Sequence, residues 1–406
     1  MNRVAFAAEE LLSQRARGLK GSDIRDAFKL TERSGMISLA GGFPEEGRFP
    51  LAELSGLIER LMATEGGRIF QYGPTEGLGS LRERVAADMA ALGLGCGVEN
   101  ILLTSGSQQA LDLVGRCFLD PGDVVLAEAP GYVGGLSAFA AYQARLVPVR
   151  VDHDGLDPDD LAETLRRLSG EGARVKLLYV VPSFQNPTGT CLPAERRAAV
   201  LRLAQEYGFL VVEDDPYRAI YFDAAPPAPL AAGEGADHVL YLGSYSKVFL
   251  PGLRLGWVAG PAPLVQRLAL AKQPADLCSN IFGQKLVEAY LAEGRLPGRV
   301  AGLRAEYRAK RDALEAALRR EAPADVTWNQ PRGGFFLWLS LPEGGDGRRL
   351  LQEALVEGVA FVAGEAFHVD GGGQRQLRLA YSQVSLDLIP TAAQRLTRAL
   401  RRHLGR

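Results

Sequence analysis

Short apolar runs alternate with amphipathic stretches from about residue 100 to residue 260. The runs are "NILLTSG", "DVVLAE", "RLVPVRV", "VKLLYVV", "FLVVEDD" and "VLYLGSYS". Because they are continuously apolar instead of alternating, they predict strands buried on both faces, as in a largely parallel sheet under helices. Between them, "SQQALDLVGRCFL" and "LPAERRAAVLRLAQEYG" predict helices, the second with Pro193 near its start and Gly208 where the chain turns out.

The two ends of the chain follow a different pattern. An early helix leads into "SGMISLAGGFP", and after about residue 290 helices mix with the strand-like runs "GGFFLWLS", "GVAFVAG" and "RQLRLAYS". This pattern predicts a second, smaller α+β domain, which the N-terminal segment is expected to join.

Composition narrows the class of protein. The chain has 406 residues, of which 47% are hydrophobic and 23% charged, with net charge −2. These values are typical of a globular protein with a large core and argue against nucleic acid or an anionic membrane as the main partner. Glu9 and Glu10 interrupt the only apolar patch near the start, so we expect neither a signal peptide nor a membrane span, and a cytoplasmic location.

The spacing of the cysteines and histidines argues against further classes of protein. The four cysteines contain no C-x-x-C pair, which fits reduced thiols, and the four histidines stand far apart in the sequence. Neither spacing matches a zinc site, so we expect no metal and no histidine-based catalytic triad.

Polar residues follow several of the predicted strands. Ser107, Asn186, Asp214 and the stretch 244–247 each come after an apolar run. In a doubly wound sheet the carboxyl ends of the strands meet at one edge, so these side chains are expected to gather there. Taken singly, each has an ordinary alternative: a helix cap, a turn starter or a loop carboxylate.

Lys247 is a lone cation in the small, mostly apolar stretch "GSYSKVFLPGLRLGW". It is either a surface lysine at a strand-to-helix turn or a nucleophile, whose pKa desolvation would lower. Near Ser107 a strand ends in small residues and a helix begins, which suits a phosphate but also an ordinary N-cap. The sequence has neither a P-loop nor a G-x-G-x-x-G motif, which favours a smaller phosphorylated cofactor. Ser244 and Arg254 could bind the same phosphate, although Arg254 could equally form a surface ion pair.

Taken together, the motifs point to a known family. They are "GSDIRDAFKLTERSGMISLAGGFP", "FQYGPTEGLGSLRERV", "TSGSQQALDLV", "PGYVGG", "PSFQNPTG", "EDDPYR", "SYSKVFLPGLRLGW", "PRGGFFLW" and "LRLAYS". With these in order, the chain resembles fold-type-I pyridoxal-5′-phosphate (PLP) aminotransferases of the class I/II branch that contains 2-aminoadipate and kynurenine aminotransferases. The resemblance implies an α/β fold: a large PLP-binding domain (49–288) with a mainly parallel seven-stranded sheet, a small C-terminal domain (289–406), and an N-terminal segment (1–48) covering the active site.

The resemblance also implies catalytic roles. Lys247 would bind PLP covalently and transfer protons. Asp214 would hold the pyridine nitrogen protonated, and the family spacing of three residues to Tyr217 selects Asp214 over Asp215. Asn186 and Tyr217 would hydrogen-bond the O3′ of the ring.

Further residues of the cofactor site follow from the same resemblance. Tyr132 would stack on the ring, and the counterpart of Tyr72 in relatives reaches the phosphate of the neighbouring subunit, which implies a homodimer with shared active sites. The expected phosphate ligands are Ser107, Gln108, Ser244, Ser246 and Arg254.

For the substrate, Arg378 would clamp the α-carboxylate, near the backbone of Gly42 and beside Asn186. Ser22 and Arg25 match the region that meets the substrate side chain. Arg25 could receive a distal carboxylate, or it could be a solvated helix charge.

The implied reaction moves an α-amino group between an L-amino acid and a 2-oxo acid by a ping-pong mechanism. Glutamate and 2-oxoglutarate are expected as one pair, with 2-aminoadipate or an aromatic, branched-chain or specialised amino acid as the other donor. A PLP decarboxylase, lyase or oxidase is the alternative. Ser244 to Lys247 also reads S-x-x-K, but the companion motifs of penicillin-recognising enzymes are absent. A PLP-binding regulator would need an extra N-terminal domain, and only about forty residues precede "LAGGFP".

Overall fold

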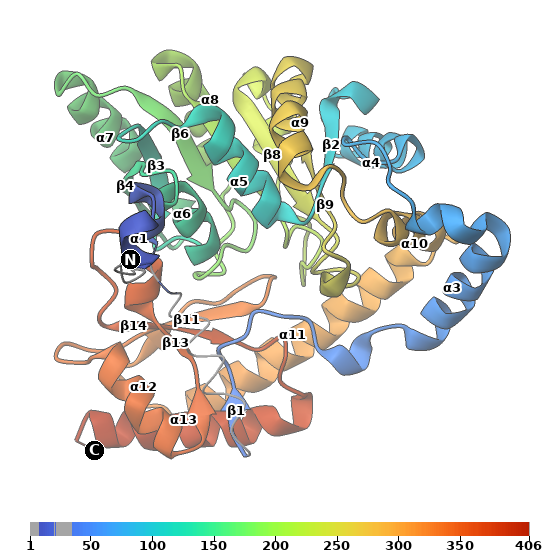
Figure 1. Cartoon of the computed structure of the whole chain (residues 1–406). Coiled ribbons are helices and arrows are strands. Elements are labelled where there is room, and N and C mark those ends of the chain that lie inside the picture. The colour runs from blue at the N-terminus through green and yellow to red at the C-terminus, as the bar shows by residue number, and fades with distance from the viewer. Residues whose placement is uncertain (1–7, 20, 22–34, 406) are drawn as a thin grey trace, which may run out of the picture.

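A computed structural model describes residues 8–19, 21 and 35–405 of the chain. It contains a large sheet with helices on both faces and a second, smaller sheet, and the long helix α11 (Leu296–Glu321) runs from one to the other (Figure 1). At 1.5 Å per residue, its 26 residues span about 39 Å, enough to join the two layers.

The large sheet has the strand order β2-β9-β8-β7-β6-β3-β4-β5. Its strands are β2 (Ile101–Thr104), β3 (Val124–Ala129), β4 (Arg145–Asp152), β5 (Gly155–Leu156), β6 (Val175–Val180), β7 (Leu210–Asp214), β8 (Val239–Ser244) and β9 (Gly256–Ala259). β8, β7, β6, β3 and β4 run parallel, and β9 is antiparallel to both of its neighbours. The mainly parallel sheet is therefore confirmed. Its seven longer strands match the expected number, and the two-residue β5 adds an eighth at the edge of β4.

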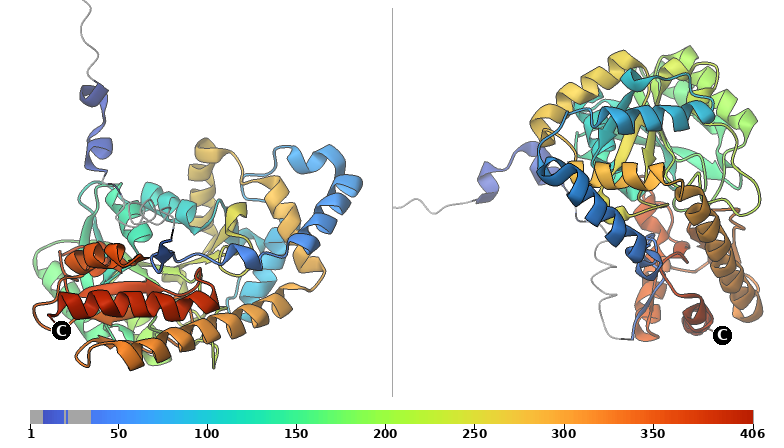
Figure 2. Two further views of the ribbon diagram at one scale, coloured as in Figure 1. Left: turned by 90° about the horizontal axis from the view of Figure 1, so that it is seen from below. Right: turned by 90° about the vertical axis from the view of Figure 1, so that its right-hand side faces the viewer.

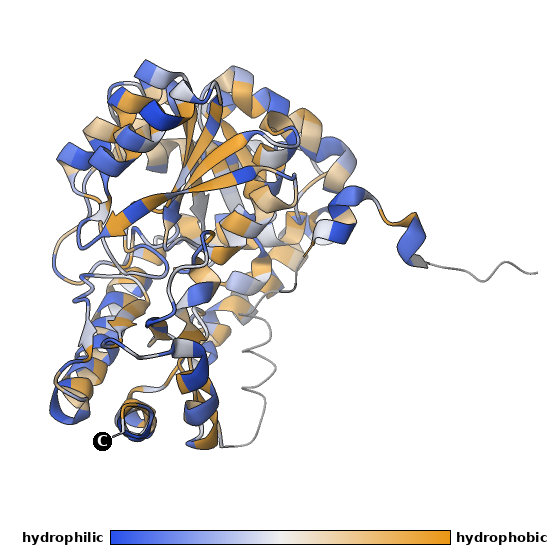
Figure 3. Ribbon diagram, turned by 90° about the vertical axis from the view of Figure 1, so that its left-hand side faces the viewer, coloured by the Kyte–Doolittle hydropathy of each residue, from blue (hydrophilic) through white to orange (hydrophobic). Residues whose placement is uncertain are grey.

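The continuous apolar runs are explained by burial on both sides of this sheet. Val125 of β3 belongs to a core cluster with α5 and α9, whereas its neighbours Val124 and Leu126 belong to the cluster with α7 and α8. Successive residues of a strand point to opposite faces, so every position here needs an apolar side chain. Figure 3 shows the apolar strands between helices whose outer faces are polar.

The helices begin and end where local chemistry allows. α8 ends at Gly208, which takes the left-handed conformation at φ 70° and donates its N–H to Ala204 O, as predicted from the sequence. The helices before α11 are α1 (Gln14–Gly18), α3 (Leu51–Glu65), α4 (Gly79–Ala91), α5 (Ser107–Phe118), α6 (Val133–Ala140), α7 (Pro158–Gly170), α8 (Ala194–Tyr207), α9 (Ala262–Asp276) and α10 (Ile281–Ala292). Short 3₁₀ turns lie at η1 (Ala8–Leu11), η2 (Glu46–Arg48), η3 (Gly66–Phe70), η4 (Val98–Asn100), η5 (Leu230–Ala232), η6 (Ala236–His238), η7 (Pro251–Leu253), η8 (Gly364–Phe367) and η9 (Leu386–Leu388).

The second sheet is antiparallel, with the order β10-β11-β14-β13. Its strands are β10 (Thr327–Trp328), β11 (Phe336–Ser340), β13 (Val362–Ala363) and β14 (Gln376–Ala380). α12 (Gly347–Val356) and α13 (Ile389–His403) pack beneath it, with α13 alongside α11 (Figure 2).

The run "GVAFVAG", expected as one strand, is divided between two sheets. β12 (Val359–Ala360) pairs in parallel with β1 (Ile37–Ser38), whereas β13, two residues further on, pairs with β14. Through β1, residues 37–38 lie beside the C-terminal region. No helix within the described residues is long and apolar enough to cross a membrane.

Candidate active site

The polar residues that follow the large-sheet strands meet at the edge predicted from the sequence. Asp214 ends β7, Asn186 lies in the loop after β6, and Lys247 follows β8. Lys247 Nζ lies 5.6 Å from the centre of the Tyr217 ring, and the charge of Asp214 acts on the pKa of Lys247. Residues far apart in the sequence therefore form one cluster.

Lys247 sits in an apolar setting. Its Nζ donates a hydrogen bond to Gly42 O at 2.9 Å, and the rings of Phe43 and Phe335 lie 5.9 and 5.7 Å away, in addition to Tyr217. The pKa of Lys247 is lowered to about 8, mainly by burial and also by the nearby cation of Arg378, against the opposing effect of Asp214. An amine with this pKa is neutral in about one molecule in ten at pH 7, far more often than an ordinary lysine.

Asp214 is 2% exposed and has one free oxygen. Its Oδ2 accepts a hydrogen bond from the Tyr179 hydroxyl at 2.9 Å, while its Oδ1 has no partner among the described residues. The pKa of Asp214 is raised to about 7, mainly by burial and also by the neighbouring Asp215, while the hydrogen bond from Tyr179 opposes the rise. A buried carboxylate oxygen without a donor is costly, so this oxygen is suited to a donor that the chain does not supply.

Tyr179 was not predicted as a site residue. The sequence contained a signal for it, since Tyr179 and Lys176 are the two residues with a polar group in the otherwise apolar run "VKLLYVV". Asp215 differs from Asp214 in its partners: its Oδ2 lies 3.4 Å from the Arg218 guanidinium, and burial raises its pKa while Arg218 opposes that rise. The two adjacent carboxylates thus face different surroundings, because successive side chains along an extended chain point to opposite sides.

Arg378, on β14, is almost fully buried and has no acidic partner among the described residues. Its Nη1 donates to Asn186 Oδ1 at 2.8 Å and its Nη2 to Ala40 O at 2.6 Å, while its Nε lacks a partner within the described chain. The guanidinium lies 4.5 Å from the Phe336 ring centre and 5.0 Å from that of Phe367. Burial lowers its pKa to about 10. A rigidly held guanidinium with open donor capacity suits a carboxylate ligand.

Tyr132 lies directly before α6, where two glycines leave room for aromatic rings. A Cβ on Gly134 would lie 2.5 Å from the Tyr132 ring, and one on Gly135 would lie 2.3 Å from the ring of Tyr179. Burial raises the pKa of Tyr132, and the charge of Asp214 adds to the rise. Gln108 Nε2 donates to Gly134 O at 2.9 Å, which ties the start of α5 to this turn.

The first turn of α5 forms an anion cradle. Its leading N–H groups lack intrahelical partners, as in every helix, and the helix dipole adds positive potential there. Arg254 faces this turn, because a Cβ on Gly106 would lie 2.5 Å from its Nη2. Arg254 forms no ion pair with a described carboxylate. Ser244 and Ser246 lie close by in the chain, with Ser246 N donating to Ser244 Oγ at 3.0 Å.

One predicted residue stands apart from this cluster, and two others lie outside the described part of the chain. Tyr72 is 78% exposed, and within the described part of the chain its backbone N–H contacts only Gln71 Oε1. Ser22 and Arg25 lie outside the described residues. Gly42 is present through its backbone, and it must be glycine because a Cβ there would lie 2.7 Å from the Phe336 ring.

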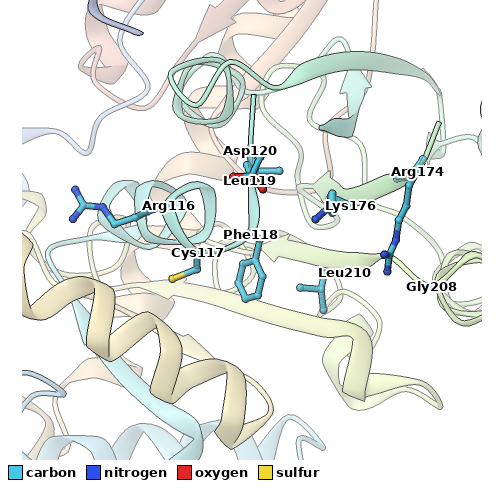
Figure 4. A pocket seen from close by; sticks show the side chains of 10 residues that line it. Arg116, Cys117, Phe118, Leu119, Asp120, Arg174, Lys176, Gly208 and Leu210 are labelled. Carbon is cyan, nitrogen blue, oxygen red and sulfur yellow. The ribbon is translucent and has the colours of Figure 1, made fainter. Parts of the chain in front are cut away.

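A separate cavity of about 310 Å³ lies at the opposite edge of the large sheet (Figure 4). It is lined near the amino ends of β6 and β7 and at the end of α5, and shares no residue with the cluster around Lys247. Two of its three basic side chains are engaged: Lys176 lies 3.6 Å from Asp123, and Arg116 contacts Ala271 O. Among the described residues, no group of three His, Cys, Asp or Glu side chains could hold a metal ion.

The sequence model of the family described as Aminotransferase class I and II matches residues 36–396. The chain belongs to this family. The aminotransferase is 38% identical to aromatic-amino-acid aminotransferase 1 of Thermococcus litoralis, over 98% of this chain and 95% of that protein. The predicted family and branch are therefore confirmed.

Two solved aminotransferase structures superimpose on nearly the whole chain. One is the kynurenine aminotransferase of Pyrococcus horikoshii in complex with PMP, with a TM-score of 0.94 and 38% identity over 98% of each chain. The other is the α-aminoadipate aminotransferase of Thermus thermophilus, complexed with N-(5′-phosphopyridoxyl)-L-leucine, with a TM-score of 0.91 and 39% identity over 98% of this chain and 100% of that one. The expected fold class is confirmed.

PLP is the cofactor of this aminotransferase. The residues present fit it. The unpartnered Oδ1 of Asp214 can accept from a protonated pyridine nitrogen, and the amine of Lys247 is desolvated. The cradle between Arg254 and the start of α5 suits a phosphate.

Proposed function

We propose that this aminotransferase transfers the α-amino group of an L-amino acid to a 2-oxo acid in two successive half-reactions, with glutamate and 2-oxoglutarate as one pair. 2-Aminoadipate or an aromatic or branched-chain amino acid is the proposed second donor. The observation that carries the proposal is that three groups lie together: the desolvated amine of Lys247, the Asp214 carboxylate and the Arg378 guanidinium. Among the described residues, one oxygen of Asp214 has no hydrogen-bond donor and Arg378 has no acidic partner. The activities of the similar aromatic, kynurenine and α-aminoadipate aminotransferases support this range of donors.

The proposal assigns the cofactor to residues of the large sheet. PLP, when bound, withdraws electrons from the substrate Cα and so stabilises the negative charge that forms there. Asp214 would hold its pyridine nitrogen, with Tyr179 fixing the carboxylate, and Asn186 and Tyr217 would bind its O3′. Tyr132 would lie against the ring. The proposed phosphate ligands are Ser107, Gln108, Ser244, Ser246 and Arg254.

Lys247 would bind PLP through its amine and then move the substrate proton. Once released from that bond, the neutral amine can accept the proton from Cα, and the ammonium can return it. The lowered pKa suits both tasks, because general acid–base catalysis is most efficient when the pKa lies near the working pH. The Gly42 carbonyl would hold the ammonium form in place.

Arg378 would bind the substrate α-carboxylate, with Asn186 and the 40–42 segment around it. The stacking of its guanidinium on Phe336 and Phe367 limits rotation, so little side-chain entropy remains to be lost on binding. Ser22 and Arg25 are proposed to meet the substrate side chain.

Further parts of the proposal concern organisation. The β1–β12 pairing supports an N-terminal segment (1–48) that joins the small domain (289–406) and covers the active site beside the large PLP-binding domain (49–288). The exposed Tyr72 supports a homodimer in which it reaches the partner's cofactor. Four free cysteines are compatible with a cytoplasmic location.

The first test is the visible spectrum of the PLP-loaded enzyme during titration with glutamate, 2-aminoadipate, leucine, kynurenine, phenylalanine and lysine. We expect conversion to the pyridoxamine form by amino acids but not by butylamine, which has no carboxylate for Arg378. The substitution Arg25→Ala should lower the affinity for dicarboxylic donors more than the affinity for leucine. A spectrum that no donor changes, or a donor that loses CO₂, would contradict the proposal. Equal losses for all donors in Arg25→Ala would remove that residue from the substrate site.

We expect the rate of PLP uptake by the apoenzyme to rise with pH up to about 8 and then to level off. An amine attacks an aldehyde only when neutral, and the neutral fraction falls about tenfold for each pH unit below the pKa. An ordinary lysine would keep the rate rising to about pH 10. Stopped-flow absorbance across this range measures the rate, and a continued steep rise above about pH 9 would contradict the lowered pKa.

A further inference from the structure

An ion pair between a fully buried lysine and a partly buried aspartate, whose side chain is 25% exposed, lies behind the turn that leads into α5. Lys272 of α9 is 0% exposed, and its Nζ donates to Oδ1 of Asp276, four residues later, at 2.6 Å. An ammonium removed from water is costly even when paired, so a buried pair of this kind is weak evidence for stability alone. We therefore expect the pair to have a role other than holding α9 in place.

The second carboxylate oxygen of Asp276 indicates such a role. Asp276 Oδ2 accepts from Ser105 Oγ at 3.2 Å and from Gln109 Nε2 at 2.7 Å. Gln109 in turn accepts from the backbone N–H of Ser105 through its Oε1 at 2.8 Å. Ser105 is thus held through its side chain and its backbone. An ionised carboxylate is the group that fits, because it can accept from Lys272 on one oxygen and from two donors on the other.

Ser105 directly precedes the anion cradle. Gly106, at φ +77°, and Ser107 follow it, and a Cβ on Gly256 would lie 3.0 Å from Ser107 N. On the other side, Arg254 Nη2 lies 3.5 Å from Ser105 O. The turn is therefore confined in front by Arg254 and β9, and behind by Asp276.

We propose that Asp276, held by Lys272, is a positioning residue for the phosphate group of PLP. By fixing Ser105 it sets where the N–H groups of Ser107 and Gln108 point, and so how well they match the phosphate oxygens. The inference rests on the proposed function, which assigns the phosphate to the start of α5 and to Arg254. The inference predicts that breaking this hydrogen-bond network lowers the affinity for PLP by weakening the contacts to its phosphate and not those to its ring.

The test compares PLP with pyridoxal, which has the same ring and aldehyde but no phosphate. The variant is the double substitution Lys272→Met with Asp276→Ala, because removing Asp276 alone would leave the charge of Lys272 buried without a partner. Dissociation constants of the full-length apoenzyme are measured for each compound by fluorescence titration, with inorganic phosphate as a competitor. We expect the affinity for PLP to fall about tenfold, or about 1.4 kcal/mol, and the affinity for pyridoxal to change by less than about twofold.

Two companion variants sharpen the comparison. Gln109→Met removes the bridge between Asp276 and the backbone N–H of Ser105 while both charges of the ion pair stay in place, and it should lower the affinity for PLP selectively as well. Lys310→Met is the matched control, because Lys310 is also 0% exposed and pairs with a carboxylate four residues before it, Glu306, on α11. It should lower the unfolding midpoint while the ratio of PLP to pyridoxal affinity stays as in the wild type.

The outcomes separate the inference from the function on which it rests. Arg254→Gln removes a direct phosphate ligand of the proposed site. If it weakens PLP selectively and the double variant does not, Asp276 has no positioning role. An equal loss of affinity for PLP and for pyridoxal in the double variant would show a general structural effect and would also overturn the inference. If Arg254→Gln leaves the PLP to pyridoxal ratio unchanged, the phosphate assignment itself is wrong.

Discussion

Replacing Lys247 by alanine is expected to lower the rate of amino transfer about 10⁵-fold, which corresponds to about 7 kcal/mol on the barrier at 25 °C. The substitution removes the amine that binds PLP and the group that moves the substrate proton, and no other lysine among the described residues lies in the cluster to replace it. The fold should persist, since the loss of a desolvated amine relieves an unfavourable burial. Single-turnover kinetics with the preferred donor, together with the unfolding midpoint of the apoenzyme, measures both effects.

Lys176→Ala is a suitable control for that experiment. Lys176 lies at the opposite edge of the large sheet, beside Asp123, and contacts no residue of the site. Its removal should leave the rate within about twofold, as for most surface changes. Turnover of amino donors by Lys247→Ala at the wild-type rate would show that the lysine has been assigned the wrong role.

Asp214→Asn is expected to lower kcat about 10³-fold, or about 4 kcal/mol on the barrier, the scale of one lost charge interaction in a site shielded from water. Asparagine keeps the shape and an acceptor for Tyr179, but it carries no charge to hold the pyridine nitrogen protonated. Without that proton the ring withdraws electrons poorly from the substrate. Steady-state kinetics over a range of donors measures the loss.

The neighbouring carboxylate supplies the comparison. Asp215 is equally buried but faces Arg218, so Asp215→Asn should keep kcat within about tenfold of the wild-type value for the fraction that folds. The unfolding midpoint reports how much of the variant is folded. A loss as large as that of Asp214→Asn would mean that the spacing to Tyr217 selected the wrong aspartate.

Sequence patterns were sufficient where local chemistry decides the structure. The apolar runs located six strands of the large sheet, and the residues after them predicted which side chains meet, because parallel strands share an edge. The glycine at 208 marked the end of α8 for the same kind of reason: a left-handed residue costs least there. These features depend on neighbours within a few residues.

Features that depend on distant partners were missed. β9 was not predicted, because "LRLGWVAG" reads as a glycine-rich turn and becomes a strand only by pairing with β2 and β8. The contact between Ser105 and Asp276 joins residues 171 apart, and the stacking of Arg378 on Phe336 and Phe367 joins two strands and a turn. No periodicity along the chain encodes such contacts.

The site draws its parts from two sheets: Lys247 and Asp214 come from the large one, whereas Arg378 and Phe367 come from the second sheet and its turns. Substitutions on this second side, other than at Arg378, can therefore alter the walls of the site while Lys247 and Asp214 stay in place. Arg378 itself has to be kept, because its charge acts on the pKa of Lys247. After gene duplication, copies of such an enzyme can diverge toward new donors by changes at the other positions around β13 and β14. A directed-evolution library that covers those positions and keeps Arg378 would sample new substrates with the reactive amine and its neighbouring carboxylate unchanged.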